Sequence, residues 1–173
     1  MINRGYIHVY TGNGKGKTTA ALGLALRAAG AGKQVLIAQF VKGNPYSEIE
    51  LIERHLPSIN IKQYGLGCFI VNAPTAEDIQ AARSGLQQVA ELMASGKYNL
   101  IILDEATIAL YYNLFSMNEL IQVIQSRPEE TEIVITGRYA PSALIEIADL
   151  VTEMNEVKHY YSQGVTAKKG IEY

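Results

Sequence analysis

A single cysteine, Cys68, is all that the 173-residue sequence holds, so no intrachain disulfide can form. Such scarcity is typical of proteins that work in a reducing compartment. The sequence also lacks an apolar run long enough to span a bilayer, and its first residues lack the pattern of a signal peptide. We therefore expect a cytoplasmic protein that has no contact with a membrane.

The sequence also has no large excess of positive or negative charge. Seventeen acidic residues stand against fifteen basic ones, and a net charge near −2 gives no general attraction to nucleic acid or to anionic lipid. One cysteine and three scattered histidines do not make a zinc site. The hydrophobic fraction of 48% is that of an ordinary globular protein. Without repeats or linkers, this length predicts one domain over residues 1–173.

The most informative segment that is present is a glycine-rich loop. Residues 11–19 read Thr-Gly-Asn-Gly-Lys-Gly-Lys-Thr-Thr and lie between an apolar run and a helix-forming run. The glycines allow a tight turn that brings backbone N–H groups close to an anion. Lys17 can reach phosphate oxygens, the Thr18 hydroxyl is placed to hold Mg²⁺, and the following helix points its positive end at the same place. The segment predicts a site for a nucleoside triphosphate. For Lys15 two interpretations stay open, a phosphate contact and a solvated loop lysine.

Apolar runs alternate with helical patterns along the whole chain. We expect strands at 6–10, 34–40, 59–64, 100–103, 133–136 and 150–153. We expect helices at 17–29, from Ser47 to before Pro57, at 75–94, from Ser116 to Gln125, and briefly after Pro141. Ser47 with Glu50, Thr75 with Asp78, and Ser116 with Glu119 have the spacing of capping boxes. This alternation predicts an α/β fold with a mainly parallel sheet covered by helices on both faces.

Polar residues follow two of the predicted strands. Asp104 and Glu105 come directly after an apolar strand, where a carboxylate can complete a Mg²⁺ shell. Arg138 follows another strand end, and its forked donors suit phosphate, although a surface salt bridge is an equally simple role. Gln39 and Lys42 flank the end of the second strand, where they either reach the same crevice or serve as capping or solvated groups.

Several segments occur together in one order along the chain. They are residues 11–21, Gln39-Phe-Val-Lys-Gly43, Leu103-Asp-Glu105, Thr136-Gly-Arg138 with Ala140-Pro141, residues 144–154, Val157-Lys-His159 and Gly170-Ile-Glu-Tyr173. Together they resemble the P-loop type of ATP:corrinoid adenosyltransferases, the cob(I)yrinic acid a,c-diamide adenosyltransferase family. The threonine in place of the usual first glycine of the loop is a trait of that family. The resemblance implies a three-layer α/β/α, P-loop NTPase-like fold of the RecA-like type.

The resemblance also implies a reaction. A Co(I) corrinoid attacks the 5′-carbon of ATP and displaces triphosphate, in adenosylcobalamin biosynthesis or salvage. Lys17, Glu105 and Arg138 would be the catalytic residues, and Mg²⁺ (or Mn²⁺) would be held by Thr18 and Glu105, with Asp104 a further ligand or a partner of a ligand. The residues implied to contact ATP are Gly12, Asn13, Gly14, Lys15, Gly16, Lys17, Thr18, Thr19 and Arg138. A reduced flavoprotein would supply the electron, and the protein would be a homodimer.

One segment departs from the family pattern. Members often carry Gly-x-Gly-Phe-x-Trp after the third strand, and its aromatic residues shape the corrinoid site. Here residues 65–71 read Gly-Leu-Gly-Cys-Phe-Ile-Val, and the chain has no tryptophan. Phe69 would then be the corrinoid contact after a shift of one residue.

Two other functions also fit the glycine loop. One is a P-loop ATPase that drives a conformational switch, with Glu105 as the base that activates water. The other is a regulatory module that binds nucleotide without chemistry. The products formed from MgATP and a reduced corrinoid would separate the three hypotheses.

Overall fold

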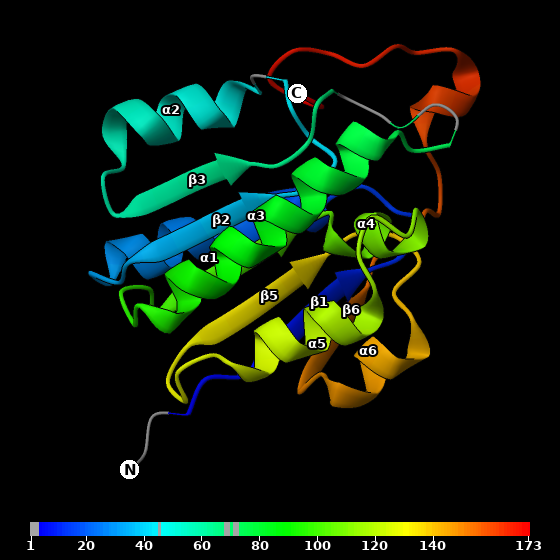
Figure 1. Cartoon of the computed structure of the whole chain (residues 1–173). Helices are drawn as coiled ribbons and strands as arrows, with labels where there is room; N and C mark the ends of the chain where they lie inside the picture. Colours follow the sequence, from blue (N-terminus) through cyan, green and yellow to red (C-terminus); the bar gives the residue numbers. More distant parts are fainter. Residues whose placement is uncertain (1–3, 45, 68–69, 71–72) are drawn as a thin grey trace.

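One parallel sheet organises the protein. The structure is a computed structural model that describes residues 4–44, 46–67, 70 and 73–173. The strand order is β3-β2-β4-β5-β1-β6, and every recorded pair is parallel (Figure 1). The strands are β1 (Ile7–Thr11), β2 (Val35–Gln39), β3 (Ile59–Gln63), β4 (Leu100–Asp104), β5 (Glu132–Thr136) and β6 (Leu150–Glu153). The carboxyl ends of parallel strands share one edge, which is where such sheets bind their ligands.

Helices cover both faces of this sheet. α1 (Lys17–Gly30) and α2 (Ser47–His55) lie on one face. The other face is covered by α3 (Ala76–Ala94), α4 (Ala106–Tyr111), α5 (Met117–Gln125) and α6 (Ser142–Ile147). Figure 1 shows α3 in front of the sheet and α1 behind it. The predicted three-layer α/β/α fold is confirmed.

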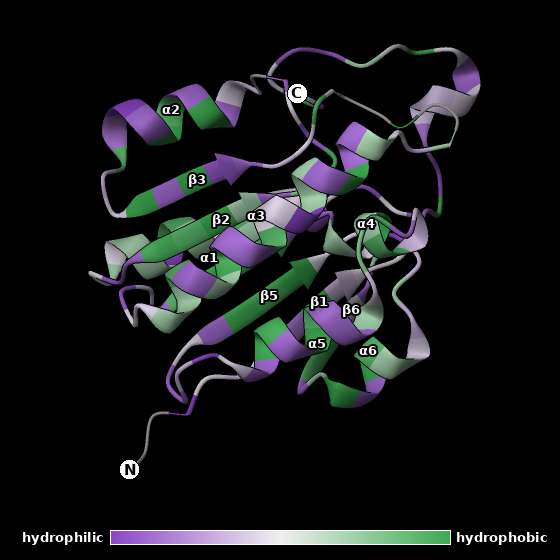
Figure 2. Cartoon of the chain, viewed as in Figure 1, coloured by the Kyte–Doolittle hydropathy of each residue, from purple (hydrophilic) through white to green (hydrophobic). Residues whose placement is uncertain are grey.

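The core forms because strand side chains alternate between the two faces. On β2, Leu36 packs toward α3 and its residue Leu86, whereas Ile37 packs toward α1 and its residue Ala25. The central strands are therefore apolar on both sides, and β5 is hydrophobic along most of its length in Figure 2. The small buried side chains of α1 let this helix lie close to the sheet, which fixes its first turn beside the carboxyl edge.

Two of the three predicted capping boxes are confirmed, and one is wrong. Thr75 and Ser116 cap α3 and α5, and in both boxes the side chain three residues later bonds back to the backbone of the cap. Ser47 does not cap α2, because the helix already begins at this residue and Tyr46 is its N-cap. The Ser47 hydroxyl instead donates to the carbonyl oxygen of Tyr173, at 3.2 Å.

Two helices were not predicted from the sequence, α4 after β4 and a short 3₁₀ helix near the end of the chain. α4 follows β4 directly, without a side-chain cap, because Glu105 at its N-cap has a left-handed backbone with φ 57°. After β6 the chain crosses the carboxyl edge of the sheet, forms a short 3₁₀ helix, η1 (Tyr160–Gln163), and ends near the start of α2 (Figure 1). Among the described residues, no helix has the length and apolar character needed to cross a membrane.

Candidate functional site

The glycine loop joins β1 to α1 and is packed against the segment that follows β6. The amide of Gly14 donates to the carbonyl oxygen of Met154 at 2.7 Å. A Cβ atom at Gly12 would lie 2.4 Å from that same oxygen, and Gly12 has a left-handed φ of 94°. A side chain at Gly12 would therefore be both strained and blocked. The loop needs glycine here because another strand's end supports it from behind.

Lys17 is the first residue of α1, and its side chain folds back beneath the loop. The ammonium donates to the carbonyl oxygens of Gly12 and Gly14, at 2.7 Å each. Only 7% of the residue is exposed, and burial lowers the pKa of its amine from the ordinary value. The lysine is thus held at the wall of the cleft that the loop lines, where a phosphate would compete for its protons.

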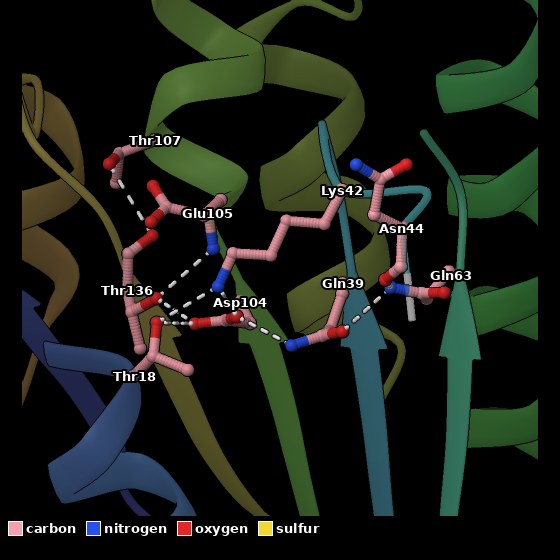
Figure 3. Close-up of polar contacts among 9 residues, drawn as sticks. All are labelled: Thr18, Gln39, Lys42, Asn44, Gln63, Asp104, Glu105, Thr107 and Thr136. Carbon is pink, nitrogen blue, oxygen red and sulfur yellow. Dashed lines mark hydrogen bonds and ion pairs between the residues drawn. The ribbon is translucent and has the colours of Figure 1, made fainter. Parts of the chain in front are cut away.

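Asp104, at the end of β4, accepts hydrogen bonds from four polar side chains that come from helix α1, two neighbouring strands and a loop (Figure 3). Its Oδ1 accepts from the hydroxyls of Thr18 and Thr136, at 2.8 and 2.6 Å. Its Oδ2 accepts from the Lys42 ammonium at 2.8 Å and from Gln39 Nε2 at 3.1 Å. Burial alone would raise the pKa of this carboxyl, but the Lys42 charge and the hydrogen bonds hold it below the ordinary value.

Glu105 is the neighbour of Asp104 but faces different surroundings. Its backbone amide donates to the Thr136 hydroxyl at 3.0 Å, which fixes the left-handed turn between β4 and α4. The carboxyl is part of the wall of the loop cleft. Burial and then the nearby Asp104 charge raise its pKa above the ordinary value, although Lys42, Lys17 and Arg138 oppose that shift. A cation close to Glu105 would favour its charged form.

A glycine turn after β5 places Arg138 opposite the loop. Gly137 has φ 134°, and a Cβ atom there would lie 2.2 Å from the Thr107 hydroxyl oxygen. That hydroxyl donates to the carbonyl oxygen of Arg138 at 2.6 Å, so α4 fixes the backbone of the arginine. The Arg138 side chain is exposed and lies between two cavities.

Those two cavities adjoin each other. The larger, of about 530 Å³, is lined by the glycine loop, the start of α1, Glu105, Arg138 and the end of the chain. The smaller, of about 340 Å³, is mostly apolar and includes Tyr111, Tyr112 and Tyr139. Lys42, Glu105 and Arg138 belong to both. The arrangement suits two ligands, one polyanionic and one with apolar surface, that meet at these three charged residues.

The end of the chain also lines the site, and although this segment was part of the family resemblance, no role in the site was predicted for it. Lys15 donates to Glu172 Oε1 at 2.8 Å and to the Ile171 carbonyl oxygen at 2.9 Å, and its ammonium also reaches the Tyr160 hydroxyl. Its charge therefore holds the tail of the chain against the loop, a contact that neither of the two interpretations included, and the residue also lines the larger cavity. The pair lies 157 positions apart, and no local pattern marks it.

The structure brings together nearly all residues that the sequence singled out. Asn13, Gly16, Thr18 and Thr19 line the larger cavity with the lysines of the loop. Lys42 lines the crevice, whereas Gln39 is fully buried and lines neither cavity, and its amide donates to Asp104 Oδ2. Phe69 lies outside the described residues. Thr107 was missed because a hydroxyl inside an apolar helix gives no sign of which turn it holds.

A glycine loop at the carboxyl edge of a parallel three-layer sheet places the protein among the P-loop NTPase-like folds. Comparison with known proteins then gives the family. The profile of the family described as "ATP:corrinoid adenosyltransferase BtuR/CobO/CobP" matches residues 3–173, and the chain belongs to that family.

Curated relatives cover nearly the whole chain as well. A corrinoid adenosyltransferase of Escherichia coli K12 is 39% identical over 171 residues, which is 98% of this chain and 86% of that protein. A corrinoid adenosyltransferase of Pseudomonas aeruginosa is 37% identical over 98% of this chain and 84% of its own length. The corrinoid adenosyltransferase CobA of Salmonella typhimurium is 37% identical over 98% of this chain and 86% of its own length. The resemblance seen in the sequence is confirmed.

Proposed function

We propose that this protein transfers the 5′-deoxyadenosyl group of ATP to a Co(I) corrinoid and releases triphosphate. A bond forms between cobalt and C5′, the bond from C5′ to the triphosphate oxygen breaks, and its electron pair leaves with the triphosphate. The observation that carries this proposal, beside the family, is the pair of adjoining cavities that share Lys42, Glu105 and Arg138. A polyanion in the larger cavity and an apolar macrocycle in the smaller one would bring the reacting atoms together.

The chain's own residues serve the leaving group. Triphosphate leaves more easily when its growing charge is stabilised by donors that are already in place. The loop amides, Lys17 and Arg138 are such donors, and Lys17 needs only to exchange its two carbonyl partners for phosphate oxygens. Such a reaction needs no base that removes a proton from water. The family therefore gives no support to the ATPase-switch alternative, in which Glu105 has that task.

Thr18 and Glu105 would hold Mg²⁺ (or Mn²⁺), and Asp104 would either join them or orient the Thr18 hydroxyl. Their oxygen atoms are the donors that Mg²⁺ prefers. Within the described part of the chain, no group of three or more His, Cys, Asp and Glu residues is arranged to hold a metal, so phosphate oxygens would complete the shell. The Lys42 ammonium already lies between Thr18 and Asp104, and this supports the proposal that a cation binds there. When bound, the ion would neutralise charge on the leaving triphosphate.

The remaining expectations also belong to this proposal. We propose one domain over residues 1–173 and a cytoplasmic location from the length and composition of the sequence. A homodimer and a reduced flavoprotein as the electron donor are proposed by resemblance to the family. The roles of Gly12, Lys15 and the other implied ATP contacts are proposals of the same kind, and so is the corrinoid contact of Phe69. The larger cavity supports the ATP contacts, because all of the residues that would make them, except Gly12, line it.

The decisive experiment identifies the phosphate product. The protein is incubated with MgATP and a chemically reduced corrinoid, and a reaction without protein is the control. We expect triphosphate together with a light-sensitive alkylcorrinoid, in equal amounts. ADP and phosphate formed equally fast without corrinoid would contradict the proposal and restore the ATPase hypothesis.

Tyr111 and Tyr139 should decide how tightly the corrinoid binds. Their ring centroids lie 4.5 Å apart, and both residues are more than half exposed, at 56% and 53%. Tyr139 also has a left-handed φ of 60°, a cost of about 1–3 kcal/mol that is typical of functional positions. A flat macrocycle would cover this aromatic surface. We expect Tyr111→Ala to raise the KM for corrinoid about tenfold, because covering an aromatic ring contributes about 1.5–3 kcal/mol.

The matched control is Tyr6→Ala, since Tyr6 is similarly exposed, at 49%, but precedes β1 and so lies at the opposite edge of the sheet. Steady-state kinetics with varied corrinoid measure the effect, and a separate ATP titration should give an unchanged Kd. If Tyr111→Ala and Tyr6→Ala behave alike, the smaller cavity is not where the corrinoid binds.

A further inference from the structure

Lys42 occupies the place of a cation inside the triphosphate site. Its ammonium lies 2.8 Å from Asp104 Oδ2 and 3.2 Å from the Thr18 hydroxyl oxygen (Figure 3). These are the two residues at which a P-loop protein assembles its metal. The side chain of Lys42 is only 14% exposed, and the Tyr46 ring centroid lies 5.4 Å from the ammonium. The lysine is therefore built into the site and is not a loose surface group.

The positive charge of Lys42 compensates the buried negative charge of Asp104. Asp104 is 1% exposed, and a buried carboxylate is costly unless an opposite charge lies beside it. Thr18, Thr136 and Gln39 give Asp104 hydrogen bonds but no positive charge. Lys42 supplies that charge and so keeps the carboxylate ionised and in place.

The same place cannot hold the ammonium and a divalent ion together. Mg²⁺ binds its oxygen ligands at about 2.0–2.1 Å and demands nearly ideal geometry. The Thr18 oxygen that would bind the ion already accepts a hydrogen bond from Lys42 and donates its own proton to Asp104. Two neighbouring cations would also repel each other strongly in this buried setting. The lysine has to leave before the ion can take its ligands.

The backbone of Lys42 is fixed, so only its side chain is free to move away. The Lys42 carbonyl oxygen accepts from the Gly65 amide at 3.1 Å, and the next amide, that of Gly43, donates to the Gly67 carbonyl oxygen at 2.8 Å. Val41 on the other side has a left-handed φ of 60°, which is rare for a β-branched residue. Strain of this kind persists where surrounding structure enforces it. Lys42 lines both cavities, so each of them offers space into which its side chain can turn.

We propose that Lys42 is an exchangeable internal cation that Mg²⁺ replaces when it arrives with ATP. The inference rests on the proposed function, because it assigns the site a metal-bound triphosphate. Before binding, Lys42 neutralises Asp104. On binding it turns away, and its charge then lies at the junction of the two cavities. After the transfer it pairs with Asp104 again and competes with the departing metal and triphosphate. Lys42 is thus a positioning residue that weakens metal binding and helps product release.

Lys42→Met tests this idea, because methionine keeps much of the side chain's length and removes its charge. We measure ATP binding by calorimetry at increasing Mg²⁺ concentrations, and once in EDTA. The Mg²⁺ concentration for half-maximal tightening of ATP binding should fall about tenfold, and inorganic triphosphate with Mg²⁺ should bind more tightly. Lys33→Met is the matched control, since Lys33 is exposed in the turn after α1, at the opposite edge of the sheet.

Lys42→Arg should change the Mg²⁺ requirement in the opposite direction, and it tests the proposal by itself if Lys42→Met does not fold. A guanidinium pairs with a carboxylate through two parallel hydrogen bonds, so it should be harder to displace. The Mg²⁺ requirement should then rise several-fold. If Lys42 were simply a phosphate ligand, Lys42→Met would weaken ATP binding in Mg²⁺ and in EDTA alike, and that result would overturn the proposal.

Different results would refute the role of Lys42 and the proposed adenosyl transfer. An unchanged Mg²⁺ requirement in Lys42→Met, or in Lys42→Arg if Lys42→Met does not fold, would refute the role of Lys42 even if the protein adenosylates corrinoids. Shifted Mg²⁺ requirements in a protein that forms no alkylcorrinoid would instead refute the proposed transfer and leave the cation exchange standing.

Discussion

Lys17→Ala is expected to weaken ATP binding about 100-fold, which corresponds to about 2.8 kcal/mol. The lysine is buried at the wall of the larger cavity, and its ammonium has two loop carbonyls as partners, which phosphate oxygens can replace. Charge-assisted hydrogen bonds to phosphate are among the strongest that a protein makes. Turnover should fall further, on the order of 10³-fold, because the donor is needed most when triphosphate leaves.

Calorimetry with MgATP measures the first effect, and the rate of alkylcorrinoid formation measures the second. Lys33→Ala is the control, since it removes an equally charged but exposed lysine at the far edge of the sheet. Near-normal affinity in Lys17→Ala would show that the loop does not bind the triphosphate. In that case the whole assignment of the larger cavity would fail.

The sequence predicted those parts of the fold that depend on local patterns. The glycine loop, the apolar strand before Asp104 and the capping box at Thr75 each lie within a few residues, so a short stretch of sequence is enough to recognise them. Ser47 shows the limit of such reasoning. Its spacing to Glu50 fits a capping box, yet the helix begins one residue earlier than the box requires and the hydroxyl bonds to the distant Tyr173. A local pattern indicates which interactions a residue can make, and the tertiary structure determines which of them forms.

The candidate site likewise contains residues that the sequence could predict and contacts that it could not. That five of the residues would lie close together was predictable, because parallel strands bring their carboxyl ends to one edge; they are Lys17, Thr18, Asp104, Glu105 and Arg138. The sequence could not show that Lys42 would pair with Asp104, since two interpretations fitted it equally well before its distance to the carboxylate was known. The tail held by Lys15 was unpredictable for a stronger reason. Its position depends on a contact between the two ends of the chain, which only the folded sheet brings together.

Asp104→Asn should destabilise the fold more than any other single change at the site. The variant removes a negative charge from a position that is 1% exposed and leaves the Lys42 ammonium without its counter-charge. Breaking a buried ion pair by removing one partner costs about 3–5 kcal/mol. Thermal and urea unfolding at neutral pH measure this loss. A free energy of unfolding within about 1 kcal/mol of the wild type would show that Lys42 finds another partner without cost.

The pH dependence gives an independent check, and its sign follows from the direction of each pKa. The pKa of Asp104 is held below its ordinary value in the folded protein, so its stabilisation is present above the ordinary pKa and is lost as pH falls through the folded value. The pKa of Glu105 is raised by burial and by Asp104, so keeping it ionised costs stability as pH rises through that range. Glu105→Gln should therefore raise the melting temperature at neutral pH while turnover falls, because Gln cannot replace the charged carboxylate that we propose as a metal ligand. The acid-induced loss of stability should be smaller in Asp104→Asn and should persist in Glu105→Gln. An equal dependence of stability on acidic pH in the two variants would contradict the opposite effects that we assign to these neighbouring carboxylates.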